Sequence, residues 1–171
     1  MELQLSPTQD KKRVFKVVQE YISKHGFNIT NFDETRPWGG FFVIDEQQSK
    51  KFIDFFFSNV EDSKKQGTGK ISPKILIVEK GKRLSWQYHH RRSELWKVIG
   101  GEVGVIKSES DTENEVKVKK VDDIITLYQG ERHRLIGLET WGIVAEIWQH
   151  TDTNNPSDED DIVRVQDDFG R

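Results

Sequence analysis

The 171-residue sequence contains no cysteine, only one methionine and only four prolines. Without cysteine the chain has no disulfide, no thiolate metal site and no cysteine nucleophile. No apolar run approaches the length of a membrane span, and the N-terminal segment lacks the hydrophobic centre of a signal peptide. The formal net charge of −3 gives no support to nucleic-acid binding through a positive field. We therefore expect a cytoplasmic protein with no membrane or nucleic-acid partner.

The length suits one domain with an additional helix or two. Apolar residues at three- and four-residue spacing predict an amphipathic helix from about Thr8 to Lys24, with Thr8 as its N-cap. From Lys74 to Ile147, short alternating apolar segments separated by turn residues predict an all-β sandwich or barrel. We divide the chain into an N-terminal helical extension, residues 1–34, and a β domain, residues 35–171.

A segment at about 46–72 interrupts the strand pattern. Asp45 to Asn59 is predicted to be helical with an unusually aromatic face, and a polar loop follows from Glu61 to Ser72. The phenylalanines of the helix either pack against the barrel or form an exposed patch used in dimerisation. We favour packing with some contribution to an interface.

Four polar residues carry the most informative spacing. Gln87 and His89 stand two residues apart on a predicted strand and therefore point to one face. Glu94 is out of phase with them, so the intervening turn must re-aim it, and His133 follows a second hairpin. An amide oxygen, two imidazoles and a carboxylate suit a divalent metal: Zn²⁺, Mn²⁺, Fe²⁺, Co²⁺ or Ni²⁺. The alternative is a hydrogen-bonded polar cluster without a metal.

Basic residues surround these four. His90-Arg91-Arg92 on one segment and Arg132 and Arg134 on the other form a basic rim. The rim is either a solvated face balanced by nearby acids or a site for phosphate, which a guanidinium binds through two parallel hydrogen bonds. The acidic run Asp158 to Asp161 is interpreted as a solvated segment or as the partner of these arginines.

Taken together, these motifs resemble those of the cupin family. The spacing G-x5-Q-x-H-x4-E-x6-G from Gly81 to Gly101 is similar to the first cupin motif, with Gln87 where many cupins carry their first histidine. Gly130 and His133 match the second motif. The closer resemblance is to the cupin domain of type II phosphomannose isomerases, and three further stretches carry it: Arg36-Pro37-Trp38-Gly39, Leu84-Ser85, and Asp160 to Arg164 with Phe169-Gly170-Arg171.

For the fold, the resemblance implies a cupin double-stranded β-helix, a jelly-roll barrel, over residues 35–171. The family's link between the Arg-Pro-Trp-Gly stretch and the metal strand is shorter, so residues 46–72 are interpreted as a helical insertion.

For the function, the resemblance implies a zinc-dependent isomerase of carbohydrate metabolism that interconverts mannose 6-phosphate and fructose 6-phosphate, and a homodimer. The implied metal ligands are Gln87, His89, Glu94 and His133. Lys74 and Arg92 are candidates for the acid/base region, and Arg164 is a catalytic candidate that anchors phosphate. Three further arginines are candidates for substrate binding: Arg36, Arg134 and Arg171.

Some positions depart from the family's pattern. Arg91 replaces the second histidine of H-x-H, Tyr128 a proline, Gly137 an asparagine and Phe169 a tyrosine. These departures keep two alternatives open: a non-catalytic cupin that binds or senses a phosphorylated sugar, and a cupin sugar epimerase. Guanylyl transfer, which is fused to this domain in many relatives, is not expected, because the sequence has no glycine-rich phosphate loop opening a helix.

Overall fold

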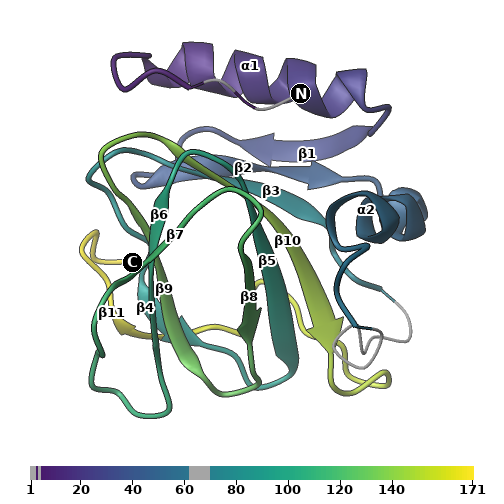
Figure 1. Ribbon diagram of the computed structural model, residues 1–171. Helices are drawn as coiled ribbons and strands as arrows, with labels where there is room; N and C mark the ends of the chain where they lie inside the picture. The colour runs from purple at the N-terminus through teal and green to yellow at the C-terminus, as the bar shows by residue number, and fades with distance from the viewer. Residues whose placement is uncertain (1–2, 4, 62–69) are drawn as a thin grey trace.

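Two antiparallel sheets pack face to face in the computed structural model, which describes residues 3, 5–61 and 70–171 (Figure 1). The six-stranded sheet has the order β1-β2-β3-β10-β5-β8, and the five-stranded sheet has the order β11-β4-β9-β6-β7. The predicted all-β jelly roll is confirmed. The strands are β1 (Ile29–Asp33), β2 (Gly39–Ile44), β3 (Lys74–Val78), β4 (Trp86–Tyr88), β5 (Arg92–Gly100), β6 (Val103–Ser108), β7 (Lys117–Lys119), β8 (Ile124–Leu127), β9 (Arg132–Gly137), β10 (Gly142–His150) and β11 (Val163–Gln166).

The six-stranded sheet has an apolar core on each face. Between the sheets, Trp96 and Val98 of β5 pack with Leu135 and other residues of the facing sheet. Because side chains alternate along a strand, Leu95 and Ile99 point to the other face, where a second core, the outer core, lies beneath the helices. Each such fully buried side chain contributes about 1.5–3 kcal/mol to folding. Glu94 lies two residues before Trp96 and points to the same face of the strand, so its carboxyl group lies in the space between the sheets.

The N-terminal helix α1 (Lys11–Lys24) begins later than predicted. Its N-cap is Asp10 and not Thr8, because the Asp10 carboxylate accepts a hydrogen bond from the backbone N–H of Arg13 at 2.8 Å. A turn closed by the bond from Gln9 N to Ser6 O precedes it, so the predicted first turn is not helical. The buried stripe of α1, which includes Val14 and Val18, belongs to the outer core.

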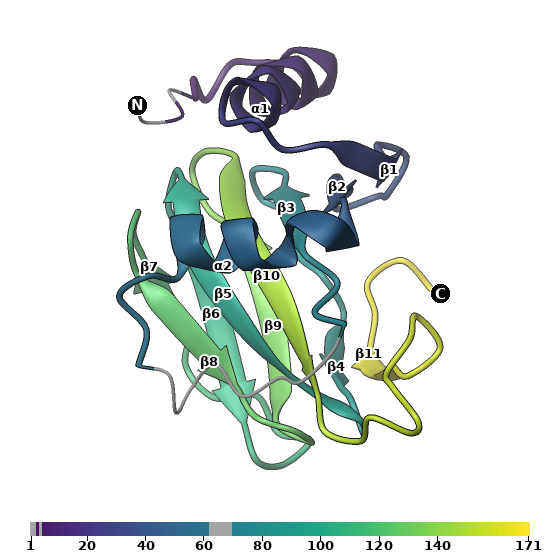
Figure 2. The same ribbon diagram turned by 90° about the vertical axis from the view of Figure 1, so that its right-hand side faces the viewer.

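The predicted helical insertion contains a short 3₁₀ helix, η1 (Glu46–Gln48), and the helix α2 (Ser49–Phe56), which crosses in front of β5 and β10 in Figure 2. Of the two alternatives for its aromatic face, packing holds for three residues, because Phe52, Phe56 and Phe57 are buried in the outer core, whereas Phe55 is 42% exposed. Residues 62–69 of the predicted loop lie outside the described part of the chain. No helix in the described part of the chain has the length and apolar character that a membrane span requires.

A glycine turn fixes the end of β5, the strand that carries Glu94. Gly101 has φ +67°, a left-handed conformation that side chains other than glycine adopt at a cost. A Cβ atom there would also lie 2.1 Å from the backbone oxygen of Trp141. Gly101 therefore permits the tight turn through which the chain passes from β5 in one sheet to β6 in the other.

Candidate metal centre

Three of the four predicted ligands meet between the sheets. His89 follows β4, Glu94 lies on β5 and His133 lies on β9 of the facing sheet. The Nε2 atom of His89 lies 3.2 Å from Glu94 Oε1, and the Nε2 atom of His133 lies 3.7 Å from Glu94 Oε2. Each side chain is only 2% exposed, and the candidate ligand atoms all lie within 4.8 Å of one another.

Backbone carbonyls fix the tautomers of both histidines. Nδ1 of His89 lies 2.6 Å from Asp161 O, and Nδ1 of His133 lies 2.9 Å from Glu131 O. Because a carbonyl oxygen only accepts, each Nδ1 carries the proton and each Nε2 presents a bare lone pair. Burial lowers the pKa of both imidazoles, that of His89 to about 4. Both are therefore neutral at physiological pH, as metal coordination requires.

The Nε2 atom of His133 is buried and has no hydrogen-bond partner among the described residues. A buried polar nitrogen without a partner is costly, and an ion between the three side chains would satisfy it. Two neutral imidazoles and a carboxylate also form a donor set that borderline divalent metals accept. The residues present therefore fit a divalent metal ion.

Glu94 supplies the negative charge of the centre. Burial opposes ionisation of its carboxyl group, but the charge of Arg92, and those of the two histidines at the low pH where they are protonated, outweigh burial and lower the pKa of Glu94 to about 2. The Nε atom of Arg92 donates to Glu94 Oε1 at 2.7 Å, and its Nη2 atom lies 3.1 Å from His89 Nε2. The guanidinium of Arg92 thus contacts two of the atoms that a metal would use.

Gln87, the fourth predicted ligand, lies beside the other three. It is directly opposite His133 where β4 pairs with β9. Its side-chain oxygen accepts a hydrogen bond from Ser85 Oγ at 2.5 Å. Gln87 also lines the cavity described next, so its amide is available to a ligand in that space.

A cavity of about 430 Å³ opens beside Glu94. Four of the predicted basic residues line it: Arg36, Lys74, Arg92 and Arg164. Arg36 pairs with Asp33 at 2.8 Å, and the ammonium group of Lys74 pairs with Glu159 and lies over the Trp148 ring. Arg164, in contrast, makes no ion pair within the described ranges.

The other two predicted substrate-binding residues are not brought to this cavity. Arg134 follows His133 on β9, so its side chain points to the outer face of the sheet, where it donates to Glu113 at 2.6 Å and to the Gln166 carbonyl. Arg171 pairs with Asp167 at 3.0 Å. Neither lines the cavity beside Glu94.

Glu146 is a residue of the site that the sequence analysis missed. It lies on β10, lines the cavity, and is 5% exposed. The indole N–H of Trp96 donates both to Glu146 at 3.0 Å and to Glu94 at 3.1 Å, so one donor links the two carboxyl groups. Burial and the nearby charge of Glu94 raise the pKa of Glu146 to about 8, against the opposing charges of Lys74 and Arg92.

The C-terminal segment positions His89. The carboxylate of Asp161 accepts hydrogen bonds from the backbone N–H groups of His90 and Arg91, at 3.0 and 2.9 Å, and from Ser157 Oγ at 2.6 Å. Its own carbonyl accepts from His89 Nδ1. Asp161 therefore ties the turn that carries His89 to the chain beyond β10. The acidic run was interpreted either as a solvated segment or as the partner of the nearby arginines. Asp158 is such a partner, because it contacts Arg91 at 3.2 Å.

We expect Asp161→Ala to weaken metal binding about 10- to 100-fold, the usual effect of removing a residue that orients a metal ligand. The reason is that the backbone of His90 and Arg91 loses its shared acceptor and His89 loses its fixed orientation. Competition with a fluorescent chelator measures the affinity. Asp152→Ala is the matched control, because Asp152 is exposed and does not line the cavity beside Glu94. Equal affinities for the two variants would show that Asp161 does not position the ligand.

The fold and the site together define a cupin, a jelly-roll barrel with imidazole and carboxylate side chains gathered inside it. The C-terminal family of mannose-6-phosphate isomerases matches residues 57–167, more than half of the chain, and the chain belongs to this family. The matched range contains all four predicted ligands together with Lys74, Arg92 and Arg164, but neither Arg36 nor Arg171.

Two solved structures of one protein, CapF, agree on the fold. The capsular polysaccharide assembling protein CapF from Staphylococcus aureus is 15% identical with a TM-score of 0.50, over 80% of this chain and 34% of CapF. CapF with the inhibitor 3-isopropenyl-tropolone gives a TM-score of 0.52 at 14% identity, with the same coverage. A cupin 2 conserved barrel domain protein from Salinispora arenicola is 16% identical, with a TM-score of 0.41 over 49% of this chain and 65% of that one. The chain thus spans about a third of CapF. No curated protein matches the sequence significantly.

Proposed function

We propose that this cupin is a metal-dependent sugar-phosphate isomerase that interconverts mannose 6-phosphate and fructose 6-phosphate, with Zn²⁺ as the metal. One observation carries the proposal: three kinds of group meet at a single cavity. These are Gln87 and Glu94 of the predicted metal-ligand set, the buried carboxyl group of Glu146, and Arg164, which has no ion-pair partner in the described chain. Membership of the mannose-6-phosphate isomerase C-terminal family supports the choice of sugar.

Aldose–ketose isomerisation moves a proton between C2 and C1 of the sugar through an enediol. It needs a base for the carbon-bound proton, stabilisation of the oxygen on which charge develops, and an anchor for the phosphate. A metal held by His89, Glu94 and His133 would polarise the sugar oxygens. Glu146 in its ionised form takes the proton from C2 of the aldose and returns it to C1, and the proton of the C2 hydroxyl passes to the C1 oxygen, so that C2 becomes the carbonyl carbon. A pKa of about 8 suits both steps near neutral pH. Lys74, opposite Glu146 on β3, adds a positive charge beside the developing oxyanion.

The phosphate is anchored by Arg164. The other three basic residues of the cavity already pair with carboxylates, whereas Arg164 is exposed and has no ion-pair partner among the described residues. A guanidinium recognises phosphoryl oxygens through two parallel hydrogen bonds.

Arg164→Ala is therefore expected to raise KM for the sugar phosphate about 10- to 150-fold, since a charge-assisted hydrogen bond contributes roughly 1.5–3 kcal/mol. Metal content should stay unchanged. Arg171→Ala is the control, because Arg171 pairs with Asp167 away from the cavity, and its KM should equal that of the wild type. If Arg171→Ala raised KM and Arg164→Ala did not, the anchor would be assigned to the wrong arginine.

The direct test of the proposed function is an isomerase assay on mannose 6-phosphate, run with and without a chelator on protein of known metal content. Turnover that the chelator removes and Zn²⁺ restores is the expected result. Metal-loaded protein without turnover on mannose 6-phosphate would contradict it.

A second candidate function is a non-catalytic cupin that binds a phosphorylated sugar. The contacts of Arg92 with Glu94 Oε1 and His89 Nε2 favour it, since a guanidinium that stays there satisfies the ligand atoms without a metal. This candidate predicts sugar-phosphate binding that a chelator does not alter, and no turnover. Calorimetric titration of mannose 6-phosphate into chelator-treated protein distinguishes the two.

A further inference from the structure

The edge strand β7 turns its lysines toward the space between the sheets and its valine outward, whereas the neighbouring strand β6 turns valines inward. In the five-stranded sheet Lys117 pairs with Val105, and Lys119 pairs with Val103. Both valines belong to the core between the sheets, and directly paired residues point to the same face. The two lysines therefore face the space between the sheets, whereas Val118 between them is 52% exposed on the outer face.

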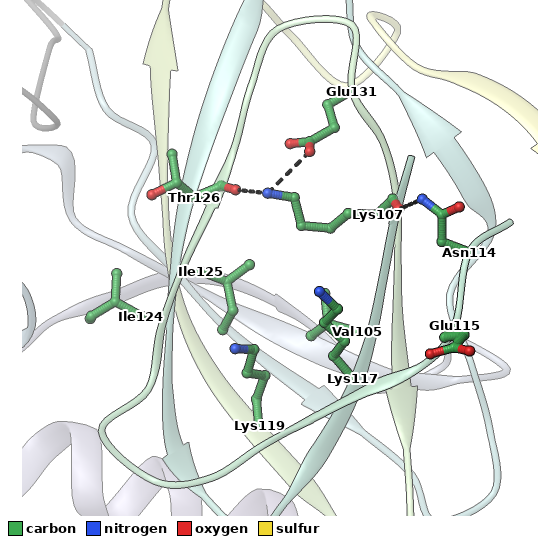
Figure 3. Close-up of a pocket in the computed structure, with 10 residues that line it drawn as sticks. All are labelled: Val105, Lys107, Asn114, Glu115, Lys117, Lys119, Ile124, Ile125, Thr126 and Glu131. Carbon is green, nitrogen blue, oxygen red and sulfur yellow. Dashed lines mark hydrogen bonds and ion pairs between the residues drawn. The ribbon is translucent and has the colours of Figure 1, made fainter. Parts of the chain in front are cut away.

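The lysines face a cavity of about 640 Å³, which Figure 3 shows between β6, β7 and β8. In the described chain, β7 pairs only with β6 and β8 only with β5, so this is where the two sheets end without joining. Val105, Ile124 and Ile125 give the cavity an apolar wall. It shares no lining residue with the cavity beside Glu94.

Of the three lysines that line this cavity, one has an acidic partner and two have none among the described residues. The ammonium group of Lys107 donates to the Thr126 carbonyl at 2.5 Å and lies 3.1 Å from Glu131, as drawn in Figure 3. The other acid that lines the cavity, Glu115, is exposed and makes no ion pair with a described residue. Lys117 and Lys119 likewise have no acidic partner in the described part of the chain. The ammonium groups of Lys117 and Lys119 thus lie beside an apolar wall and have no acidic partner among the described residues.

We propose that this cavity is a second ligand site, which takes a small amphipathic organic anion. The apolar body of the ligand rests against Val105 and Ile125, and its carboxylate, sulfonate or phosphate oxygens lie between Lys117 and Lys119. Charged oxygens alone would gain little at amines this close to water, and an apolar body alone would leave the amines without partners. Recognition therefore needs both parts in one molecule.

The test uses 8-anilinonaphthalene-1-sulfonate, an aromatic body with one sulfonate, as the probe. Titration into the full-length, ¹⁵N-labelled protein locates the site by amide chemical shifts, and fluorescence gives the affinity. The double variant Lys117→Gln/Lys119→Gln is expected to bind the probe about tenfold more weakly, because it loses one to two charge-assisted contacts. Lys82→Gln/Lys120→Gln removes the same charge at two exposed lysines and is expected to bind like the wild type.

Shifts confined to β6, β7 and β8, together with an affinity loss only in the first variant, are the expected result. Inorganic sulfate should bind at least tenfold more weakly than the probe. Inward-pointing lysines also protect an edge strand from pairing with other chains, a role that needs no ligand. Shifts elsewhere in the protein, or equal affinities for the two double variants, would assign the lysines to that role and overturn the proposal.

Discussion

Glu94→Gln is expected to abolish stoichiometric metal binding and to lower the free energy of unfolding by about 3–5 kcal/mol, the usual cost of leaving one partner of a buried ion pair alone. The partner is Arg92, which is 5% exposed and lies over the Trp148 ring at 3.6 Å. Without the carboxylate, the partners that remain to the guanidinium among the described residues are neutral: Ser157 Oγ, the Asp158 carbonyl, His89 and the Trp148 ring. Elemental analysis measures the metal, and urea unfolding of the metal-free protein measures stability.

Two variants make this result interpretable. Glu139→Gln is the same chemical change at a side chain that is 95% exposed, and it should alter neither metal content nor stability by more than about 0.5 kcal/mol. Adding Arg92→Met to Glu94→Gln removes the uncompensated charge, so stability should recover in part while metal binding stays lost. A Glu94→Gln protein that retains one metal ion per chain would contradict the assigned ligand set.

Glu146→Gln is expected to become steadily more stable than the wild type as the pH rises from about 4.5 to about 8. Across that window the folded wild type holds a proton on Glu146, whose pKa is about 8, while the unfolded chain has released it. The unfolded state therefore binds fewer protons, and raising the pH destabilises the folded wild type by up to about 1.4 kcal/mol per pH unit. Glutamine has no such proton, and its amide oxygen still accepts from Trp96.

Urea unfolding of metal-free wild type and Glu146→Gln at several pH values from 5 to 9 measures this difference. It should grow to a few kcal/mol and level off above pH 8. A difference that is the same at every pH would mean that Glu146 is ionised in the folded protein, and its role as the group that carries the C2 proton would then lose its support.

The sequence contains enough information for the metal centre and much less for its surroundings. Gln87, His89, Glu94 and His133 could be placed together because short strands fix which residues share a face, and turns separate them at distinctive spacings. The same alternation could have excluded Arg134, because its neighbour His133 points inward. Of the basic residues interpreted as one rim, Arg132 and Arg134 thus share the outer face of β9, whereas Arg92 lies between the sheets beside Glu94.

Glu146 was missed because strand alternation does not separate it from the apolar residues beside it. It is the sole acid in β10, whose residues are all buried, and an acid in such a strand must find a partner or stay neutral. That feature is a usable signal, but the partner, the indole N–H of Trp96, depends on how β5 and β10 pair. The start of α1 was misjudged for a simpler reason, because Thr8 and Asp10 are both acceptable caps by residue type.

Anomalous X-ray diffraction from zinc-loaded crystals would show whether His89, Glu94 and His133 hold one divalent metal ion. We predict one strong anomalous peak inside the barrel, about 2.0–2.2 Å from Nε2 of both histidines and from a carboxylate oxygen of Glu94. Reaching that position requires the guanidinium of Arg92 to move off His89 Nε2. A map with no peak there, and Arg92 still bonded to both ligand side chains, would contradict the account.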